Sequence, residues 1–152
     1  LGKNNSIKRF VNNFNKLPDY LKKCIVIEND DKVFNVSDTL KISDMINVPI
    51  VLDYHHYKCN KSDIDIERIF KTWNIKPKLH FSSPKSKKNF RSHSDYINSD
   101  DFIEFIEFIK KYNTDVDIML ETKMKDEALF RLVRELKYKT NYNFIDDTSF
   151  EI

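Results

Sequence analysis

The sequence predicts an α/β fold in which parallel strands alternate with helices, and three observations predict it. Four short runs are almost continuously apolar, as is typical of parallel strands covered on both faces. Segments with apolar residues at helical spacing lie between these runs. Each run also ends in a carboxylate or an imidazole. Strict alternation favours right-handed crossovers, and both a doubly wound sheet and half of a (β/α)₈ barrel satisfy it.

The predicted strands cover residues 24–27, 49–52, 78–81 and 117–120. Helices are predicted over residues 17–23, 36–46, 63–73, 101–112 and 126–138. Asn35 or Ser37 is placed to cap the helix over 36–46. The aromatic residues of the helices over 63–73 and 101–112 fall on the apolar stripes, so we interpret them as core and not as surfaces for stacking bases. No structure is assigned to the tail from residue 140 to residue 152, and residues 1–152 are treated as one region.

Composition indicates an ordinary globular domain, with 40% apolar and 33% charged residues. No run of about 18 apolar residues and no signal peptide occurs, so we expect a soluble intracellular protein without a membrane contact. The two cysteines argue against a disulfide-stapled domain. Cys24 is expected to be a buried thiol and Cys59 a spectator near His56. The chain begins with Leu1 and not Met, which indicates a fragment or a processed product.

The residues at the ends of the predicted strands are the ones that indicate a function. Glu28, Asp53, His80 and Glu121 close the four apolar runs in order. Because functional groups gather at the C-terminal ends of parallel strands, we expect these side chains to form one ring of oxygen and nitrogen donors. Three converging carboxylates would repel each other without a cation, so the ring predicts bound metal ions.

Two more histidines fit this site, His56 shortly after Asp53 and His93 in the loop after the third strand. Mixed imidazole and carboxylate donors favour Mn²⁺, Zn²⁺ or Fe²⁺ over Ca²⁺. A cluster of two or three such ions is suited to phosphodiester hydrolysis, because one ion activates water while others hold the attacked and leaving oxygens.

Basic residues in the loop after the third strand predict a contact with a nucleic-acid backbone: Lys85, Lys87, Lys88 and Arg91. Lys78 is predicted to point inward two positions before His80, where an unpaired ammonium is costly. It must therefore be paired with a carboxylate, neutral or chemically modified.

Five segments together resemble the UV-damage endonuclease family. They are Ile27-Glu28-Asn29-Asp30-Asp31, Leu52-Asp53-Tyr54-His55-His56, Lys78-Leu79-His80-Phe81-Ser82-Ser83, Arg91-Ser92-His93-Ser94-Asp95-Tyr96 and Met119-Leu120-Glu121-Thr122-Lys123. The resemblance implies the C-terminal half of a TIM (β/α)₈ barrel, in an enzyme that nicks DNA 5′ of pyrimidine dimers and 6-4 photoproducts. The implied partner is double-stranded DNA that contains UV lesions.

The resemblance also implies roles for individual residues. Glu28 would bridge two metal ions, and Asp53, His80 and Glu121 would complete the shell of one ion. His56 and His93 would hold a third. Lys78 matches a family lysine that can be carboxylated, and Glu28, Lys78 and Glu121 are the implied catalytic residues. Mn²⁺ is the first choice of metal, with Zn²⁺ or Mg²⁺ as alternatives.

The resemblance begins near the middle of the family's sequence, whereas a whole barrel needs roughly 250 residues. We therefore expect a fragment, one part of a split protein that lacks its N-terminal half-barrel, or a degenerate copy, inactive by itself. The alternatives are an AP endonuclease of the same superfamily, a sugar isomerase or epimerase on the same barrel, and an inactive half-barrel that binds DNA or a partner chain.

Overall fold

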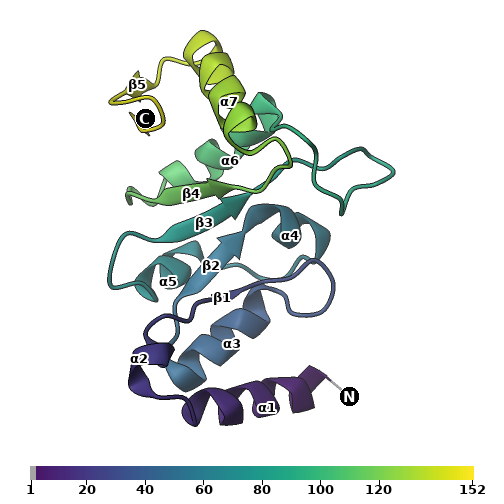
Figure 1. Cartoon of the computed structure of the whole chain (residues 1–152), viewed down its shortest axis with the longest axis vertical. Helices are drawn as coiled ribbons and strands as arrows, with labels where there is room; N and C mark the ends of the chain where they lie inside the picture. Colours follow the sequence, from purple (N-terminus) through teal and green to yellow (C-terminus); the bar gives the residue numbers. More distant parts are fainter. Residues whose placement is uncertain (1–2) are drawn as a thin grey trace. The chain divides into compact units, whose positions relative to one another are not determined.

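The structure is a computed structural model that describes residues 3–152 and has an α/β architecture (Figure 1). The α-helices are α1 (Lys3–Asn15), α2 (Asp19–Lys22), α3 (Val36–Ile46), α4 (Tyr54–Cys59), α5 (Ile66–Lys71), α6 (Ser99–Lys110) and α7 (Lys125–Lys139). The strands are β1 (Ile27–Glu28), β2 (Ile50–Asp53), β3 (Lys78–Phe81), β4 (Asp117–Leu120), β5 (Asn143–Phe144) and β6 (Phe150–Glu151).

One sheet has the strand order β1-β2-β3-β4. β1 and β2 are parallel, with Ile27 opposite Ile50 and Glu28 opposite Val51. The sheet confirms the predicted parallel α/β class. Contacts divide the chain into one unit of residues 1–79 and 115–117 and a second unit of residues 80–114 and 118–152.

The core of the first unit is built around a helix that the sequence did not predict. α1 buries Ile7, Val11 and Phe14, which recur at helical spacing along one face. These side chains form a cluster with Ile42 of α3 and Val48. The helix was not predicted because the positions between these apolar residues are polar and rich in Lys and Asn.

The first predicted strand begins too early. Cys24 and Ile25 belong to the turn after α2, where their backbone N–H groups donate to Leu21 and Lys22. As a result, β1 begins at Ile27. The prediction that Cys24 is buried was wrong, because its side chain is exposed and its Sγ donates to the Tyr20 carbonyl.

Capping explains where the helices of the first unit begin. Asn35 and Asp38 form a reciprocal capping box that fixes the start of α3, and this confirms Asn35 as its cap. Asp65 caps α5, which starts three residues later than the predicted helix over 63–73. Asp53 caps α4, a short helix that the sequence did not predict.

The second unit packs its aromatic stripe as predicted. Phe81 of β3 stacks on Phe105 of α6 with ring centroids 5.0 Å apart and meets Phe102 edge-on at 5.2 Å. All three rings are buried, which confirms that these aromatics are core. In the tail from residue 140, β5 and β6 pair in an antiparallel hairpin. Within residues 3–152, no helix is long and apolar enough to span a membrane.

Candidate metal centre

The first unit holds a cluster of two carboxylates and one imidazole. β1 ends at Glu28, and β2 ends at Asp53. The Asp53 carboxylate accepts from the His56 backbone N–H at 2.6 Å and so starts α4, the helix that carries His56. The His56 Nδ1 lies 3.2 Å from Glu28 Oε1 and 3.7 Å from Asp53 Oδ2. The three predicted ligands of this unit therefore lie together.

Asn29 fixes this cluster, although it was not among the predicted site residues. Its side-chain amide donates to the Asp53 carbonyl, and its Oδ1 accepts from the Asp53 N–H, both at 3.0 Å. Its own carbonyl lies 3.0 Å from His56 Nδ1. Asn29 is 1% exposed, so a buried amide links the end of β1 to the end of β2. Its position directly after Glu28 was the available signal.

Because the first cluster is largely buried, the negative charges of its carboxylates need a compensating positive charge nearby. The Asp53 side chain has no exposed surface, and Glu28 is about one-third exposed. The hydrogen bond to Glu28, helped by the Asp53 charge, raises the pKa of His56 from 6.5 to about 9 against the opposing effect of burial. A protonated imidazole thus compensates the carboxylates when no metal is bound, and a divalent cation would serve the same electrostatic purpose.

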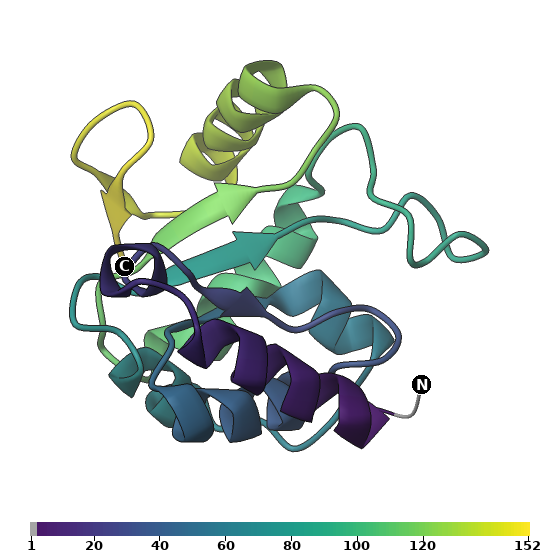
Figure 2. The ribbon, with the colours of Figure 1, turned by 60° about the horizontal axis from the view of Figure 1, so that its bottom comes forward.

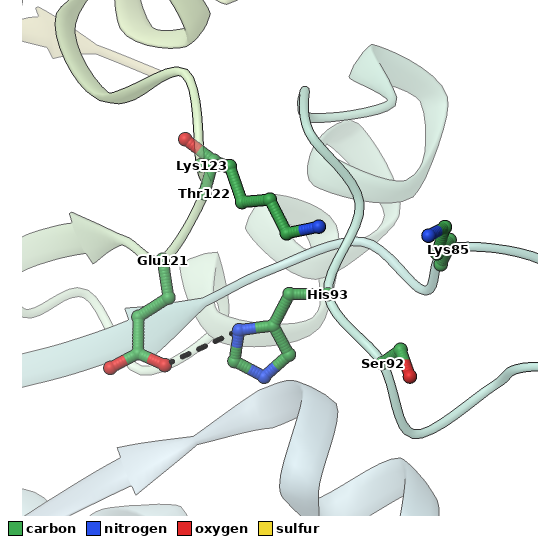
Figure 3. A pocket seen from close by; sticks show the side chains of 6 residues that line it. All are labelled: Lys85, Ser92, His93, Glu121, Thr122 and Lys123. Carbon is green, nitrogen blue, oxygen red and sulfur yellow. Dashed lines mark ion pairs between the residues drawn. The ribbon is translucent and has the colours of Figure 1, made fainter.

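The second unit holds a similar cluster of one carboxylate and two imidazoles. His80 lies in β3, and Glu121 directly follows β4. The Glu121 N–H donates to the Phe81 carbonyl at 2.9 Å. This hydrogen bond places Glu121 beside Phe81, the residue that follows His80. His80 Nδ1 lies 3.1 Å from Glu121 Oε1, and His93 Nδ1 lies 3.6 Å from Glu121 Oε2 (Figure 3). The predicted ligands of the second unit therefore also lie together.

A hairpin-like loop brings His93 to Glu121. Pro84 and His93 form an isolated antiparallel bridge, and the Lys85 N–H donates to the Ser92 carbonyl at 2.7 Å. The Ser94 N–H donates to the Ser83 carbonyl at 2.9 Å. We call residues 84–93 the basic hairpin. It extends well beyond the end of β3 (Figure 2).

The donor set of the two clusters fits a divalent metal. Glu28 and Asp53 of the first cluster, and His80 and Glu121 of the second, offer three carboxylates and one imidazole as candidate metal ligands. Hard oxygen donors mixed with imidazole suit Mn²⁺, Zn²⁺ or Mg²⁺.

The basic hairpin exposes its four cationic residues, Lys85, Lys87, Lys88 and Arg91. Because these side chains reach solvent, an approaching ligand can contact them.

Lys78 is less buried than its predicted inward-pointing position implied. Its side chain is 38% exposed and forms an ion pair with Asp117 of β4, with Lys76 nearby. The hydrogen bond from Lys78 holds the pKa of Asp117 below its ordinary value. Of the three alternatives, pairing with a carboxylate is the one that this structure contains.

His55 and Cys59 are not among the candidate metal ligands described above. His55 is fully buried on α4, and its Nε2 lies 3.8 Å from the Cys59 Sγ.

Comparisons with known proteins give a consistent result. The family model described as UV-endonuclease UvdE matches residues 1–151. A UV DNA damage endonuclease from Bacillus cereus strain G9842 is 46% identical over 141 residues, covering 88% of this chain and 44% of the relative. One from Bacillus mycoides strain KBAB4 is 43% identical over the same length. The crystal structure of SacUVDE superposes with a TM-score of 0.79 at 35% identity, covering 90% of this chain and 47% of that one. The chain thus spans less than half the length of these relatives.

Proposed function

Because the chain belongs to the UV-endonuclease UvdE family, we propose that it supplies much of the metal centre of a DNA repair endonuclease that nicks the phosphodiester 5′ of UV photoproducts. The observation that carries this proposal is the pair of carboxylate–imidazole clusters at the ends of successive strands. Such donors at strand ends are what metal-dependent phosphodiester hydrolysis requires.

The proposed roles follow the donor chemistry. Glu28, Asp53, His80 and Glu121 would hold metal ions, with Glu28 shared between two of them. His56 and His93 would hold a third ion, and each lies beside a carboxylate of its own cluster. When bound, such ions would activate water for attack and would neutralise charge on the phosphate. We place Mn²⁺ first, with Zn²⁺ or Mg²⁺ as alternatives.

The protein's own groups prepare this chemistry. Asn29 holds the end of β2 against the end of β1, so that Asp53 and Glu28 keep their separation. His56 would have to lose its proton before its Nδ1 could hold an ion, and Glu28 and Asp53, which now contact this nitrogen, would then be available to the metal. Metal binding and proton release at this cluster are therefore coupled.

The basic hairpin is the proposed contact with double-stranded DNA that carries UV lesions. Its lysines and Arg91 are exposed and lie in the same unit as His93, which the hairpin itself carries. Contacts of this kind bind phosphates without reading sequence. They would orient the duplex.

The complete active form is proposed to be a (β/α)₈ barrel, to which this chain contributes the C-terminal half. The matching regions cover 44% of the Bacillus cereus relative and 47% of SacUVDE. Carboxylation of Lys78 is retained as a proposal only for that complete form, because Asp117 already balances its charge here.

A nicking assay tests the proposal. The chain, alone and mixed with the N-terminal part of the Bacillus cereus relative, is given Mn²⁺ and supercoiled DNA that is UV-irradiated, depurinated or undamaged. We expect nicking of irradiated DNA by the mixture, and we expect Glu28→Gln to lose it at unchanged folding. Glu67→Gln is the matched control, since Glu67 is exposed and pairs with Lys71 on the surface of α5.

Two results would contradict the proposal. A preference for depurinated DNA would favour the AP endonuclease alternative. Full nicking by Glu28→Gln would remove the metal assignment.

A further inference from the structure

A pocket of about 500 Å³ opens beside the second cluster, within the second unit (Figure 3). Its walls come from the basic hairpin and from the connection between β4 and α7. The lining residues are Lys85, Ser92, His93, Glu121, Thr122 and Lys123. This volume accommodates a nucleotide unit.

The lining has the chemistry of an anion site. Lys123 extends from the β4–α7 connection toward the hairpin, which carries Lys85 (Figure 3). Glu121 is the one acid among the lining residues, and its oxygens are already turned toward His80 at 3.1 Å and His93 at 3.6 Å. The two ammonium groups are therefore the charges that this pocket offers to a ligand.

Hydroxyl groups complete the site. Ser92 and Thr122 both line the pocket. Within residues 3–152, the buried Thr122 Oγ1 has no hydrogen-bond partner, so a donor remains unused at this wall. Two cations with two hydroxyl groups are a set that binds the non-bridging oxygens of a phosphate.

The surroundings hold the two walls in place. Asp95 pairs with Lys123 at 3.5 Å, and its carbonyl accepts from the Met124 N–H at 3.2 Å. The Tyr96 hydroxyl donates to Glu127 of α7 at 2.6 Å. The segment after the basic hairpin is thus fastened to the start of α7. The Lys123–Asp95 pair is exposed and weak, so an arriving phosphate can replace Asp95 as the partner of Lys123.

We infer that this pocket binds the backbone phosphate next to the one that is cleaved, with Lys123 and Lys85 as its positioning residues. The inference rests on the proposed function for the identity of the ligand, because Glu121 and His93 belong to both the pocket and the metal centre. It divides the basic residues into two classes. Lys85 and Lys123 hold one defined phosphate, whereas Lys87, Lys88 and Arg91 make general backbone contacts.

The first test uses inorganic phosphate and metal-free ¹⁵N-labelled chain, with chloride at equal ionic strength as the reference. We expect saturable amide shifts centred on Ser92, Thr122 and Lys123. Lys123→Ala should weaken phosphate binding by about threefold to tenfold. Lys110→Ala is the matched control, because Lys110 is an ion-paired lysine of the same unit outside the pocket, and it should bind phosphate like the wild type.

An absence of saturable shifts at these amides would overturn the inference, and so would equal phosphate affinity in Lys123→Ala. Neither result depends on metal binding or nicking. A chain that binds phosphate here but fails the nicking assay would contradict the proposed function and leave the pocket in place.

A second test locates the phosphate in DNA. Single methylphosphonates are placed at successive positions around the expected nick, and the binding of each duplex by the wild type and by Lys123→Ala is compared. We expect one position at which the neutral linkage weakens the wild type but has no effect on the variant. A Lys123→Ala effect that is equal at every position would assign Lys123 to the general backbone contacts instead.

Discussion

At the scale of single residues, the neighbours of His56 determine its protonation. Its Nδ1 faces Glu28, Asp53 and the Asn29 carbonyl, three acceptors within 3.7 Å. These contacts raise its pKa to about 9. The folded, metal-free protein therefore holds a proton at the position that we assign to a metal ion.

The pH dependence of stability follows from this shift. The folded pKa of His56 lies above its unfolded value of 6.5, so the protonated contact stabilises the fold fully below pH 6.5. That contribution is lost as pH rises through about 9. In metal chelator, the free energy of unfolding measured in urea should fall between these two pH values for the wild type. His56→Gln should lack this decrease, and an identical decrease in the variant would contradict the assigned cause.

Most of the residues that make up the candidate site could be predicted from the sequence. Glu28, Asp53, His80 and Glu121 could be predicted as candidate ligands because each closes an apolar run, and the ends of the strands determine where these side chains lie. Asn29 was not found, because its importance comes from hydrogen bonds to Asp53, a residue 24 positions away. Lys123 was recognised only as part of a motif, since the pocket that gives it a role depends on the path of the basic hairpin.

At the scale of elements, the sequence predicted those helix ends that are determined by capping residues close by in the chain. The helix over 36–46 agrees with α3 at both ends, because Asn35 and Asp38 cap it and Asn47 ends it in the left-handed conformation. α4 was not predicted, because it is short and begins through the carboxylate of a strand-end residue. The first strand was predicted to begin too early, because the first residues of the apolar run belong to the turn after α2.

The capping box of α3 gives a prediction at this scale. Asn35→Ala removes the acceptor for the Asp38 N–H and should lower the free energy of unfolding by about 1 kcal/mol. Urea denaturation of the two proteins provides the measurement. Asn12→Ala serves as the control, because Asn12 is exposed inside α1, where alanine is a better helix former. Equal losses in the two variants would show that the cap is not the cause.

At the scale of the whole molecule, the proposed contact between the basic hairpin and DNA gives a testable prediction. The double variant Lys87→Ala and Lys88→Ala should bind duplex less tightly and with a smaller salt dependence, the slope falling by about 0.9 for each phosphate that the variant no longer neutralises. Fluorescence anisotropy at several salt concentrations measures this slope. The pair Lys110→Ala and Lys111→Ala, at the end of α6, is the control and should leave the slope unchanged. An unaltered slope in the hairpin variant would mean that the hairpin does not touch DNA.

The central proposal is that Asp53 and His80 are ligands in one metal centre. Mn²⁺ binding to the whole chain, measured by calorimetry for Asp53→Asn, for His80→Gln and for the double variant, tests it most directly. We predict that each single change weakens the same binding event and that the double change costs less than the sum of the two. Two independent binding events, each abolished by only one of the changes, would contradict the account.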